Sequence, residues 1–243
     1  MAARRADLVL VERGLFESRA KARAAIEAGG VTADGAPVTR AAQLIDPAAD
    51  IVAEPAHPWV GRGGLKLDHA LGLWPVKIKG AVVLDLGAST GGFTEVCLAR
   101  GAAKVFAVDV GRDQLHPRLR ADARVVDLSG IDARDLTVAL VPEPPSVIVC
   151  DASFIGLAKV LPAALALAAP GAELVALVKP QFEVGPERVG KGGVVREASA
   201  RADAARAVAA WLEGRGWNVR ADAESPVPGG EGAREHLLWA VKA

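Results

Sequence analysis

The stretch Val82-Val-Leu-Asp-Leu-Gly-Ala-Ser-Thr-Gly-Gly-Phe93 decides the fold of this chain. An apolar strand leads into a carboxylate, Asp85, and then into a glycine-rich turn that opens a helix. The glycines of this turn, Gly87, Gly91 and Gly92, allow the backbone to approach a ligand closely. The pattern therefore predicts a nucleotide-like ligand at the edge of an α/β sheet.

The spacing of this turn differs from that of a dinucleotide site. Dinucleotide sites use Gly-x-Gly-x-x-Gly to hold a pyrophosphate at a helix N-terminus, whereas here Asp85 precedes Gly87. A carboxylate repels a pyrophosphate and suits a ligand with a cationic amino group and ribose hydroxyls, such as S-adenosylmethionine. A second carboxylate, Asp109, ends the next apolar strand, where an acidic residue binds ribose hydroxyls. A purely structural glycine turn in another α/β protein is the alternative.

The composition is that of a globular protein. The chain has 243 residues, 51% of them hydrophobic, which suits one large domain or one medium and one small domain. Its formal net charge is zero, so binding to nucleic acid requires a local basic patch. Cys97 and Cys150 lie far apart in apolar surroundings, which favours reduced thiols over a disulfide or a metal site. We therefore expect no metal. Since no uninterrupted apolar run marks a secretion signal, we also expect a cytoplasmic protein.

The most lipid-like stretch, Val160–Val178, is long enough to cross a bilayer. Pro162 and Pro170 interrupt it. Divided at these positions, it predicts a helix through Ala169, a Pro-Gly turn and a buried strand over Leu174–Val178, as an α/β sheet requires. We therefore expect no association with a membrane.

The N-terminal part of the chain predicts a small α+β module. A short amphipathic helix is expected over Ala6–Arg13, and Ser18 is placed to cap a second helix that ends at Gly29-Gly30. An Asp34-Gly35 turn then joins two short extended segments in a hairpin, and Ile51 begins a further strand.

Basic residues gather in this module. Arg19 and Arg23 lie four residues apart on one face of the second helix, with Lys21 beside them. On charge alone, an ordinary solvated face is the alternative. The order of the elements resembles the S4 RNA-binding domain over residues 5–53, and this resemblance implies a basic surface for structured RNA. The residues expected to bind RNA are Arg4, Arg5, Arg19, Lys21, Arg23 and, beyond the module, Arg62.

Proline and glycine predict a linker over residues 55–64, because they exclude regular structure there. We therefore expect one domain over residues 1–54 and another over residues 65–243, which begins with a helix at Leu65. In this second domain apolar strands alternate with helical stretches, which predicts a Rossmann-like α/β fold with helices on both faces of a mainly parallel sheet. The last two strands are expected as a hairpin that makes one strand antiparallel.

Four charged residues are expected at one rim of this sheet. Asp151 and Lys179 each follow an apolar strand, and Glu235 precedes the last strand. Lys66, at the start of the first helix of the domain, can reach the same rim. Because ligands and catalytic groups gather at the carboxyl ends of parallel strands, these residues predict a neutral cluster of two lysines and two carboxylates. Taken singly, a lysine at a strand end is usually a surface residue and a glutamate before a last strand is usually exposed, whereas the apolar neighbours of Asp151 favour a role for it.

Such a cluster suits methyl transfer from a sulfonium to a ribose 2′-hydroxyl, which must lose a proton as it attacks. Lys179 can accept this proton if Lys66 and partial burial lower its pKa. If Lys179 stays charged, its ammonium stabilises the developing alkoxide instead. The residues alone leave both roles open.

The whole chain resembles the TlyA proteins, S4-domain ribosomal RNA methyltransferases also called hemolysins, with an FtsJ-like (RrmJ-like) catalytic domain. The motifs that carry the resemblance are Arg62-Gly-Gly-Leu-Lys66, Leu84–Phe93, Asp151-Ala-Ser-Phe-Ile155, Lys179-Pro-Gln-Phe-Glu183, Gly192-Gly-Val-Val-Arg196 and the end that contains Glu235. The resemblance implies a catalytic tetrad of Lys66, Asp151, Lys179 and Glu235. It also implies 2′-O-methylation of cytidine in ribosomal RNA or ribosomal subunits, with S-adenosylmethionine as methyl donor.

The residues expected to bind this cofactor are Asp85, Gly87, Ser89, Thr90, Gly91, Gly92, Phe93, Asp109 and Asp132. Asp132 is preferred to Asp127 for the adenine amino group, because Ile131-Asp132-Ala-Arg-Asp resembles the usual methyltransferase turn. Glu235 is preferred to Glu231 as the tetrad carboxylate, because Leu-Leu-Trp follows it closely.

Trp59, Phe154 and Phe182 are expected near the cleft, where they would offer a few aromatic contacts to RNA. Gly192 and Gly193 predict either a loop that closes on RNA or an ordinary surface loop. One alternative function is a non-catalytic protein that binds ribosomal RNA or assists ribosome assembly. Another is a membrane-lytic hemolysin, for which the chain lacks a suitable segment. The modified nucleotide and the oligomeric state stay open.

Overall fold

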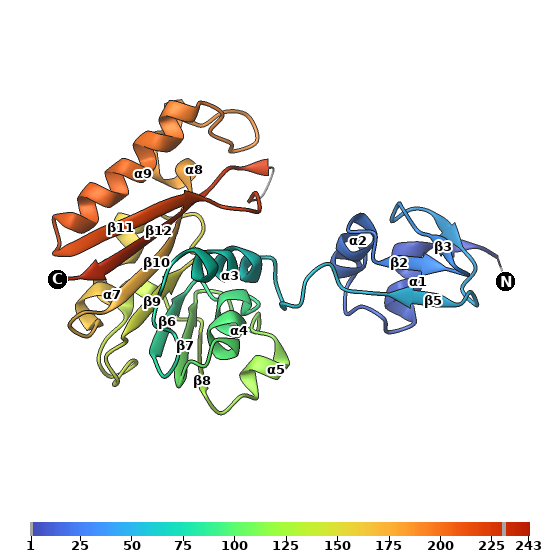
Figure 1. Cartoon of the computed structure of the whole chain (residues 1–243), viewed down its shortest axis with the longest axis horizontal. Coiled ribbons are helices and arrows are strands. Elements are labelled where there is room, and N and C mark those ends of the chain that lie inside the picture. The colour runs from blue at the N-terminus through green and yellow to red at the C-terminus, as the bar shows by residue number, and fades with distance from the viewer. Residues whose placement is uncertain (1, 230–231) are drawn as a thin grey trace. The chain divides into compact units, whose positions relative to one another are not determined.

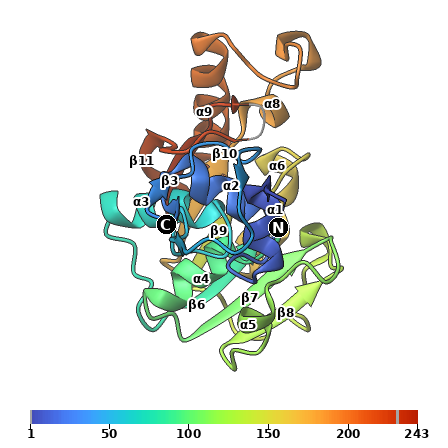
Figure 2. The ribbon, with the colours of Figure 1, turned by 90° about the vertical axis from the view of Figure 1, so that its right-hand side faces the viewer.

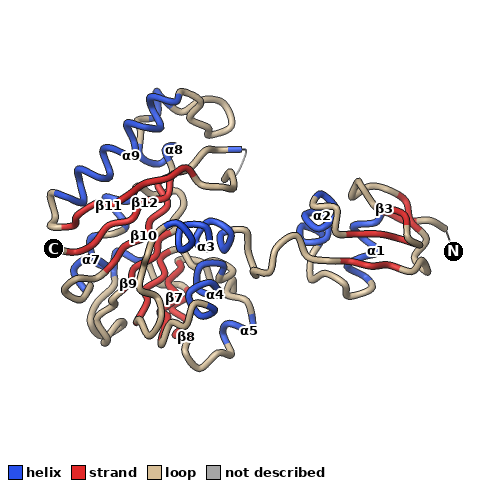
Figure 3. Tube along the Cα trace, viewed as in Figure 1, coloured by secondary structure: helices blue, strands red, loops and turns tan. Residues whose placement is uncertain are grey.

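The computed structural model describes residues 2–229 and 232–243. Packing divides the chain into two units, the first ending at Pro58 and the second running from Trp59 to Ala243. Figure 1 colours both units along the chain, and Figure 3 marks their helices and strands. One hydrophobic core lies in the first unit and two lie in the second, on opposite faces of its sheet.

The first unit packs two helices, α1 (Ala6–Glu12) and α2 (Arg19–Glu27), against short antiparallel strands. A three-stranded sheet has the order β3-β2-β5, and a two-residue ladder pairs β1 with β4. The strands are Arg4–Arg5 (β1), Val31–Ala33 (β2), Ala36–Pro37 (β3), Leu44–Ile45 (β4) and Ile51–Ala53 (β5). Leu10, Ile26 and Val31 are buried at the centre of this core.

The local signals read from the sequence of this unit are confirmed. Ser18 caps α2, because its hydroxyl accepts a hydrogen bond from the backbone N–H of Lys21 at 3.3 Å. Asp34 and Gly35, with φ of 49° and 75°, form the two-residue turn between β2 and β3. The short β1–β4 ladder was not expected, because two-residue strands leave no periodic pattern in a sequence.

The second unit contains a seven-stranded sheet of order β11-β12-β10-β9-β6-β7-β8 in the described part of the chain. Its strands are Val82–Leu86 (β6), Lys104–Asp109 (β7), Val125–Ser129 (β8), Val147–Cys150 (β9), Glu173–Val178 (β10), Trp217–Glu224 (β11) and His236–Lys242 (β12). Neighbouring strands from β8 to β10 are parallel, whereas β12 runs antiparallel to both β10 and β11. The predicted mainly parallel sheet with one antiparallel strand is thereby confirmed.

Helices cover both faces of this sheet, as expected. One face packs against α3 (Gly63–Leu73), α4 (Gly92–Ala99) and α5 (Pro117–Arg120). The other packs against α6 (Leu157–Val160), α7 (Pro162–Leu167) and α9 (Ala198–Glu213), and α9 lies beside β11 in the two views of Figures 1 and 2. The remaining short elements are the helix α8 (Pro180–Glu183) and the 3₁₀ turns η1 (Ala133–Asp135) and η2 (Pro186–Arg188).

Two helices differ from their predicted bounds. The first helix of the second unit begins at Gly63 and not at Leu65, because the backbone N–H of Leu65 already bonds to the Arg62 carbonyl. The helix expected through Ala169 ends at Leu167 and is split before Pro162, whose missing N–H interrupts the hydrogen-bond ladder. Among residues 2–229 and 232–243, no helix is both long and apolar enough to span a membrane.

Candidate active site

Two adjoining cavities lie at the carboxyl ends of the parallel strands in the second unit. The β7 cavity, of ≈ 790 Å³, is lined by the end of β7, by residues after β7, β8 and β9 and by the end of α6. The α3 cavity, of ≈ 580 Å³, is lined by the first turn of α3, the glycine turn, the ends of β9 and β10 and the entry to β12. Both are lined by Gly87, Ser89, Asp151, Ser153, Phe154 and Phe182.

The glycines of the turn serve different purposes. Gly87 has φ of +78°, and a Cβ at this position would lie 2.9 Å from the Cα of Ala152, so only glycine lets the turn pass this neighbour. Gly92 lines the α3 cavity, and a Cβ there would lie 2.9 Å from the backbone nitrogen of Gly64, so its small size lets α3 approach. Gly91 lines neither cavity, and a Cβ there would lie 2.2 Å from Cδ1 of Leu119, so its contact with the cofactor stays a prediction.

Asp85 also lines neither cavity, although the sequence predicted a contact with the cofactor. Its side chain is fully buried against α4, where Oδ2 accepts a hydrogen bond from the Thr94 hydroxyl at 2.6 Å. Its Oδ1 has no hydrogen-bond partner within the described residues. Burial raises the pKa of Asp85 to about 7, and the nearby carboxylates Asp151 and Asp109 act in the same direction. Asp85 is therefore buried beneath the turn, and its contact with the cofactor stays a prediction.

Asp109, at the end of β7, lines the β7 cavity and anchors the glycine turn. Its Oδ2 accepts a hydrogen bond from the backbone N–H of Ser89 at 2.8 Å, and its Oδ1 accepts one from Gly111 at 2.7 Å. Ser89 has φ of +48°, a conformation that costs energy for a residue other than glycine. The carboxylate thus fixes the turn and still faces the cavity. Thr90 and Phe93 line the α3 cavity instead.

The structure separates the two acids considered for adenine. Asp132 lines the β7 cavity and accepts hydrogen bonds from the backbone N–H and the Nη2 of Arg134, at 2.9 and 2.6 Å. The Arg134 hydrogen bonds lower the pKa of Asp132, so this carboxylate stays ionised. Asp127 lines neither cavity and forms an ion pair with Arg120 at 3.1 Å.

All four members of the predicted tetrad line the α3 cavity, where they form two ion pairs. The Nζ of Lys66, in the first turn of α3, lies 2.5 Å from Oε2 of Glu235, and both side chains are buried. The Nζ of Lys179 lies 2.7 Å from Oδ1 of Asp151, as an ion pair outside hydrogen-bond geometry. Because β12 is antiparallel, its first residues lie at the same edge as the last residues of β9 and β10. Glu231 lies outside the described residues.

Sequence reasoning missed the residues that hold these pairs. The hydroxyl of Ser153 accepts a hydrogen bond from Lys179 Nζ at 2.7 Å, and the Asp151 carbonyl accepts another at 3.1 Å. A Cβ on Gly63 would lie 3.2 Å from Oδ2 of Asp151, and one on Gly229 would lie 2.3 Å from Oε1 of Glu235. The only sequence signal for a role of Ser153, Gly63 and Gly229 at these ion pairs was their small size.

The aromatic residues expected at the cleft have different positions. Phe154 is 91% exposed with φ of +65°, and its ring centroid lies 5.4 Å from that of Phe182. Both rings line the two cavities. Trp59 lines neither, because it packs against the α3 backbone, where a Cβ on Gly64 would lie 2.5 Å from its Cγ. The loop glycines Gly192 and Gly193 line the α3 cavity.

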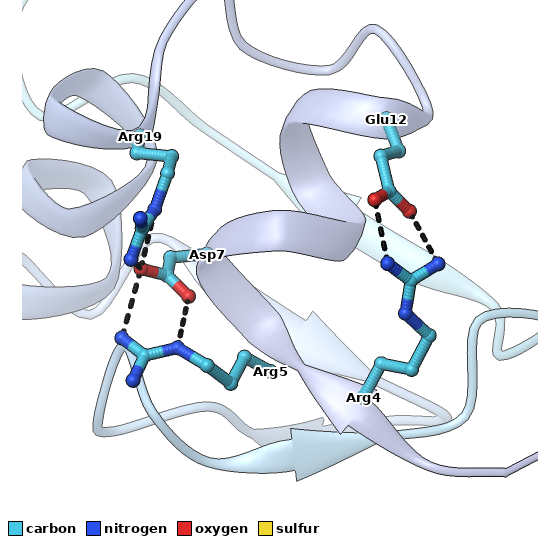
Figure 4. Close-up of polar contacts among 5 residues, drawn as sticks. All are labelled: Arg4, Arg5, Asp7, Glu12 and Arg19. Atoms are coloured by element: carbon cyan, nitrogen blue, oxygen red, sulfur yellow. Dashed lines mark hydrogen bonds and ion pairs between the residues drawn. The ribbon is translucent and has the colours of Figure 1, made fainter.

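Most basic residues predicted to bind RNA are ion-paired (Figure 4). Arg4 pairs with Glu12, and Arg5 and Arg19 share the carboxylate of Asp7. Lys21 forms an ion pair with Glu17, and Arg62 lines the α3 cavity. Arg23 has no ion pair in the described part of the chain. No group of three or more His, Cys, Asp or Glu within residues 2–229 and 232–243 is arranged to hold a metal ion.

Two families match the chain. The S4 domain matches residues 4–51, and the FtsJ-like methyltransferase family matches residues 59–242. A relative from Mycobacterium tuberculosis, 16S/23S rRNA (cytidine-2′-O)-methyltransferase TlyA, is 46% identical over 237 residues, which cover 97% of this chain and 88% of that protein.

Solved structures agree with this match. A Streptococcus thermophilus protein described by the name hemolysin is 37% identical with a TM-score of 0.78, and the match covers 100% of this chain and 90% of that one. An S-adenosylmethionine-dependent methyltransferase from Mesorhizobium loti shares the fold alone. It is 16% identical with a TM-score of 0.51, and the match covers 73% of this chain and 98% of that one. With an S4 domain ahead of an FtsJ-like methyltransferase domain and a relative of this kind matched over 97% of its residues, the chain belongs to the TlyA family.

Proposed function

We propose that this protein is an S-adenosylmethionine-dependent 2′-O-methyltransferase that acts on cytidine in ribosomal RNA. The observation that carries the proposal is the presence of two ion pairs, Lys66–Glu235 and Lys179–Asp151, in a cavity that adjoins a second one. A protein that only binds RNA has no need for two lysines held by carboxylates at the edge of a sheet. The substrate is inferred from the relative at 46% identity, whose name states 16S/23S rRNA and cytidine-2′-O.

The β7 cavity has the chemistry that the cofactor requires. Asp109 offers a carboxylate to ribose hydroxyls, and Asp132 offers an ionised acceptor to an adenine amino group. Val110, which is 69% exposed, and Ile131 supply apolar walls for a flat ring. When bound, the cofactor would supply an electrophilic methyl group.

The α3 cavity has the groups that a 2′-hydroxyl requires. Lys179 is held on three sides, by the carboxylate and carbonyl of Asp151 and by the hydroxyl of Ser153. In this position its Nζ would either take the hydroxyl proton or stabilise the oxygen as that proton leaves. Glu235 fixes Lys66, whose ammonium would orient the ribose or an adjacent phosphate.

Binding of RNA would use both units. The chain has a formal net charge of zero, so contact with phosphates depends on local groups. We assign this role to the basic residues of the S4 domain and to Arg62, which lines the α3 cavity. Residues 1–54 would thus deliver structured RNA to a catalytic domain over residues 65–243.

The test is transfer of a labelled methyl group from S-adenosylmethionine to 16S and 23S ribosomal RNA and to ribosomal subunits, followed by mapping of alkali-resistant linkages. The proposal expects label at a cytidine 2′-oxygen, loss of that label in Lys179→Ala, and wild-type activity in Lys104→Ala, whose lysine pairs with Glu143 on the surface. Binding of RNA without transfer to any of these substrates would favour the non-catalytic alternative.

A further inference from the structure

Asp7, in the first turn of α1, is a buried carboxylate held by two arginines. Its side chain has no exposed surface, while the side chains of Arg5 and Arg19 remain 40% and 53% exposed. Arg5 donates from Nε to Oδ1 at 2.9 Å and from Nη2 to Oδ2 at 3.0 Å. Arg19 donates to Oδ2 from Nη2 at 2.7 Å and from Nε at 3.1 Å. Figure 4 shows the two side chains converging on this one carboxylate from β1 and α2.

This arrangement leaves an ordered excess of positive charge. The hydrogen bonds of Arg5 and then those of Arg19 hold the pKa of Asp7 well below its usual range, so the three groups together carry a charge of +1. The Nη1 of each arginine has no hydrogen-bond partner within the described residues. Two guanidinium groups with free donors are therefore held side by side at the surface, in the planar geometry that matches phosphate oxygens.

The neighbouring pair Arg4–Glu12 provides the contrast. Its two hydrogen bonds, at 2.7 and 2.8 Å, join one guanidinium to one carboxylate, and both side chains are 49% exposed. This pair has one guanidinium for one carboxylate, so it is neutral. Glu12 therefore neutralises Arg4, whereas Asp7 orients two arginines and leaves one positive charge in excess.

We propose that Asp7 is a positioning residue that holds Arg5 and Arg19 as a preformed two-armed site for phosphate groups of structured RNA. The inference rests on the proposed function, since it needs an RNA substrate, but it assigns to an acidic residue a role in binding a polyanion. The long side chains of the two arginines lose their rotational freedom when they bind Asp7 during folding. Binding of RNA therefore does not cost this conformational entropy a second time. Without Asp7 both arginines would have to be ordered by the RNA itself.

The decisive experiment compares Asp7→Asn with Glu12→Gln in the full chain. Each substitution removes one negative charge from the same domain, so a model based on charge alone predicts tighter binding of RNA in both. Positioning predicts opposite results: Asp7→Asn weakens binding of 23S ribosomal RNA about tenfold, the cost of ordering two long side chains, whereas Glu12→Gln leaves it equal or tighter. Tighter binding in both variants would overturn the inference.

Two further measurements separate positioning from loss of folding. Arg19→Lys keeps the charge and Asp7 but removes the fork, and we expect about tenfold weaker binding with an unchanged melting temperature. In Asp7→Asn we expect a raised KM for RNA, an unchanged kcat at saturating RNA and an unchanged affinity for S-adenosylmethionine. Arg19→Lys with wild-type affinity would overturn the inference. Failure of the wild type to bind ribosomal RNA would overturn the proposed function along with it.

Discussion

Asp85 makes the stability of the second unit depend on pH in a direction opposite to that of most carboxylates. Burial raises its pKa from 3.8 to about 7, so between these values the folded protein holds a proton that the unfolded chain has released. Stability is therefore fully present below the unfolded pKa and falls as pH rises through the folded pKa. At 1.36 kcal/mol per pH unit, the free energy of unfolding falls by about 2 to 3 kcal/mol between pH 5 and pH 8.

Thermal unfolding measures this effect. In a unit of this size, a loss of about 2 to 3 kcal/mol lowers the melting temperature by roughly 5 to 10 °C. Asp85→Asn cannot titrate, so its melting temperature should fall less than that of the wild type over the same pH range. The difference between the two proteins isolates Asp85, because every other titrating group is common to both.

Equal pH dependence in the two proteins would refute the reasoning. It would mean that the carboxyl is ionised in the folded state at pH 5, with its unpartnered Oδ1 bonded to water. Substitution of Thr94 by Val provides a second check. The Thr94 hydroxyl favours the charged form of Asp85, so its removal should move the pH dependence upward.

Two more substitutions test the packing and the chemistry of the site. Gly91→Ala should lower the free energy of unfolding by about 2 kcal/mol, measured by urea unfolding, because φ is +96° and the new methyl would lie 2.2 Å from Cδ1 of Leu119. Unchanged stability would show that the turn tolerates a side chain. Glu235→Gln should lower the single-turnover rate of methyl transfer at least about 100-fold, because Lys66 loses its partner. Lys66→Ala added to Glu235→Gln should lower it little further, and fully additive losses would show that the two residues act separately.

The strands of the second unit could be predicted because a parallel strand covered on both faces reads as an apolar run. Val147–Cys150 and Leu174–Val178 are such runs, and both are buried throughout. The start of α3 could not be predicted, because it depends on contacts with distant parts of the chain. Gly63 lies against Asp151 and Phe93, and no local pattern records that contact.

The rim of the sheet could be predicted, but the direction of individual side chains could not. Asp85 occupies the expected place in the sequence, yet the alternation of side chains along β6 turns it toward α4 and Thr94. Gly91 belongs to the same motif and faces Leu119. The pairing of each lysine with its carboxylate was also beyond the sequence, because Lys66 and Glu235 are separated by 169 positions.

That separation has a consequence for the newly made protein. Lys66 lies in the first helix of the second unit and Glu235 enters its last strand, β12, which is inserted between β10 and β11. While a ribosome is still synthesising this chain, β10 has no partner on that side and Lys66 has no carboxylate. A nascent chain can thus fold much of the sheet and still be inert, and it gains the complete tetrad only after β12 has left the exit tunnel. Premature termination before this strand would yield a protein without the reaction proposed for the whole.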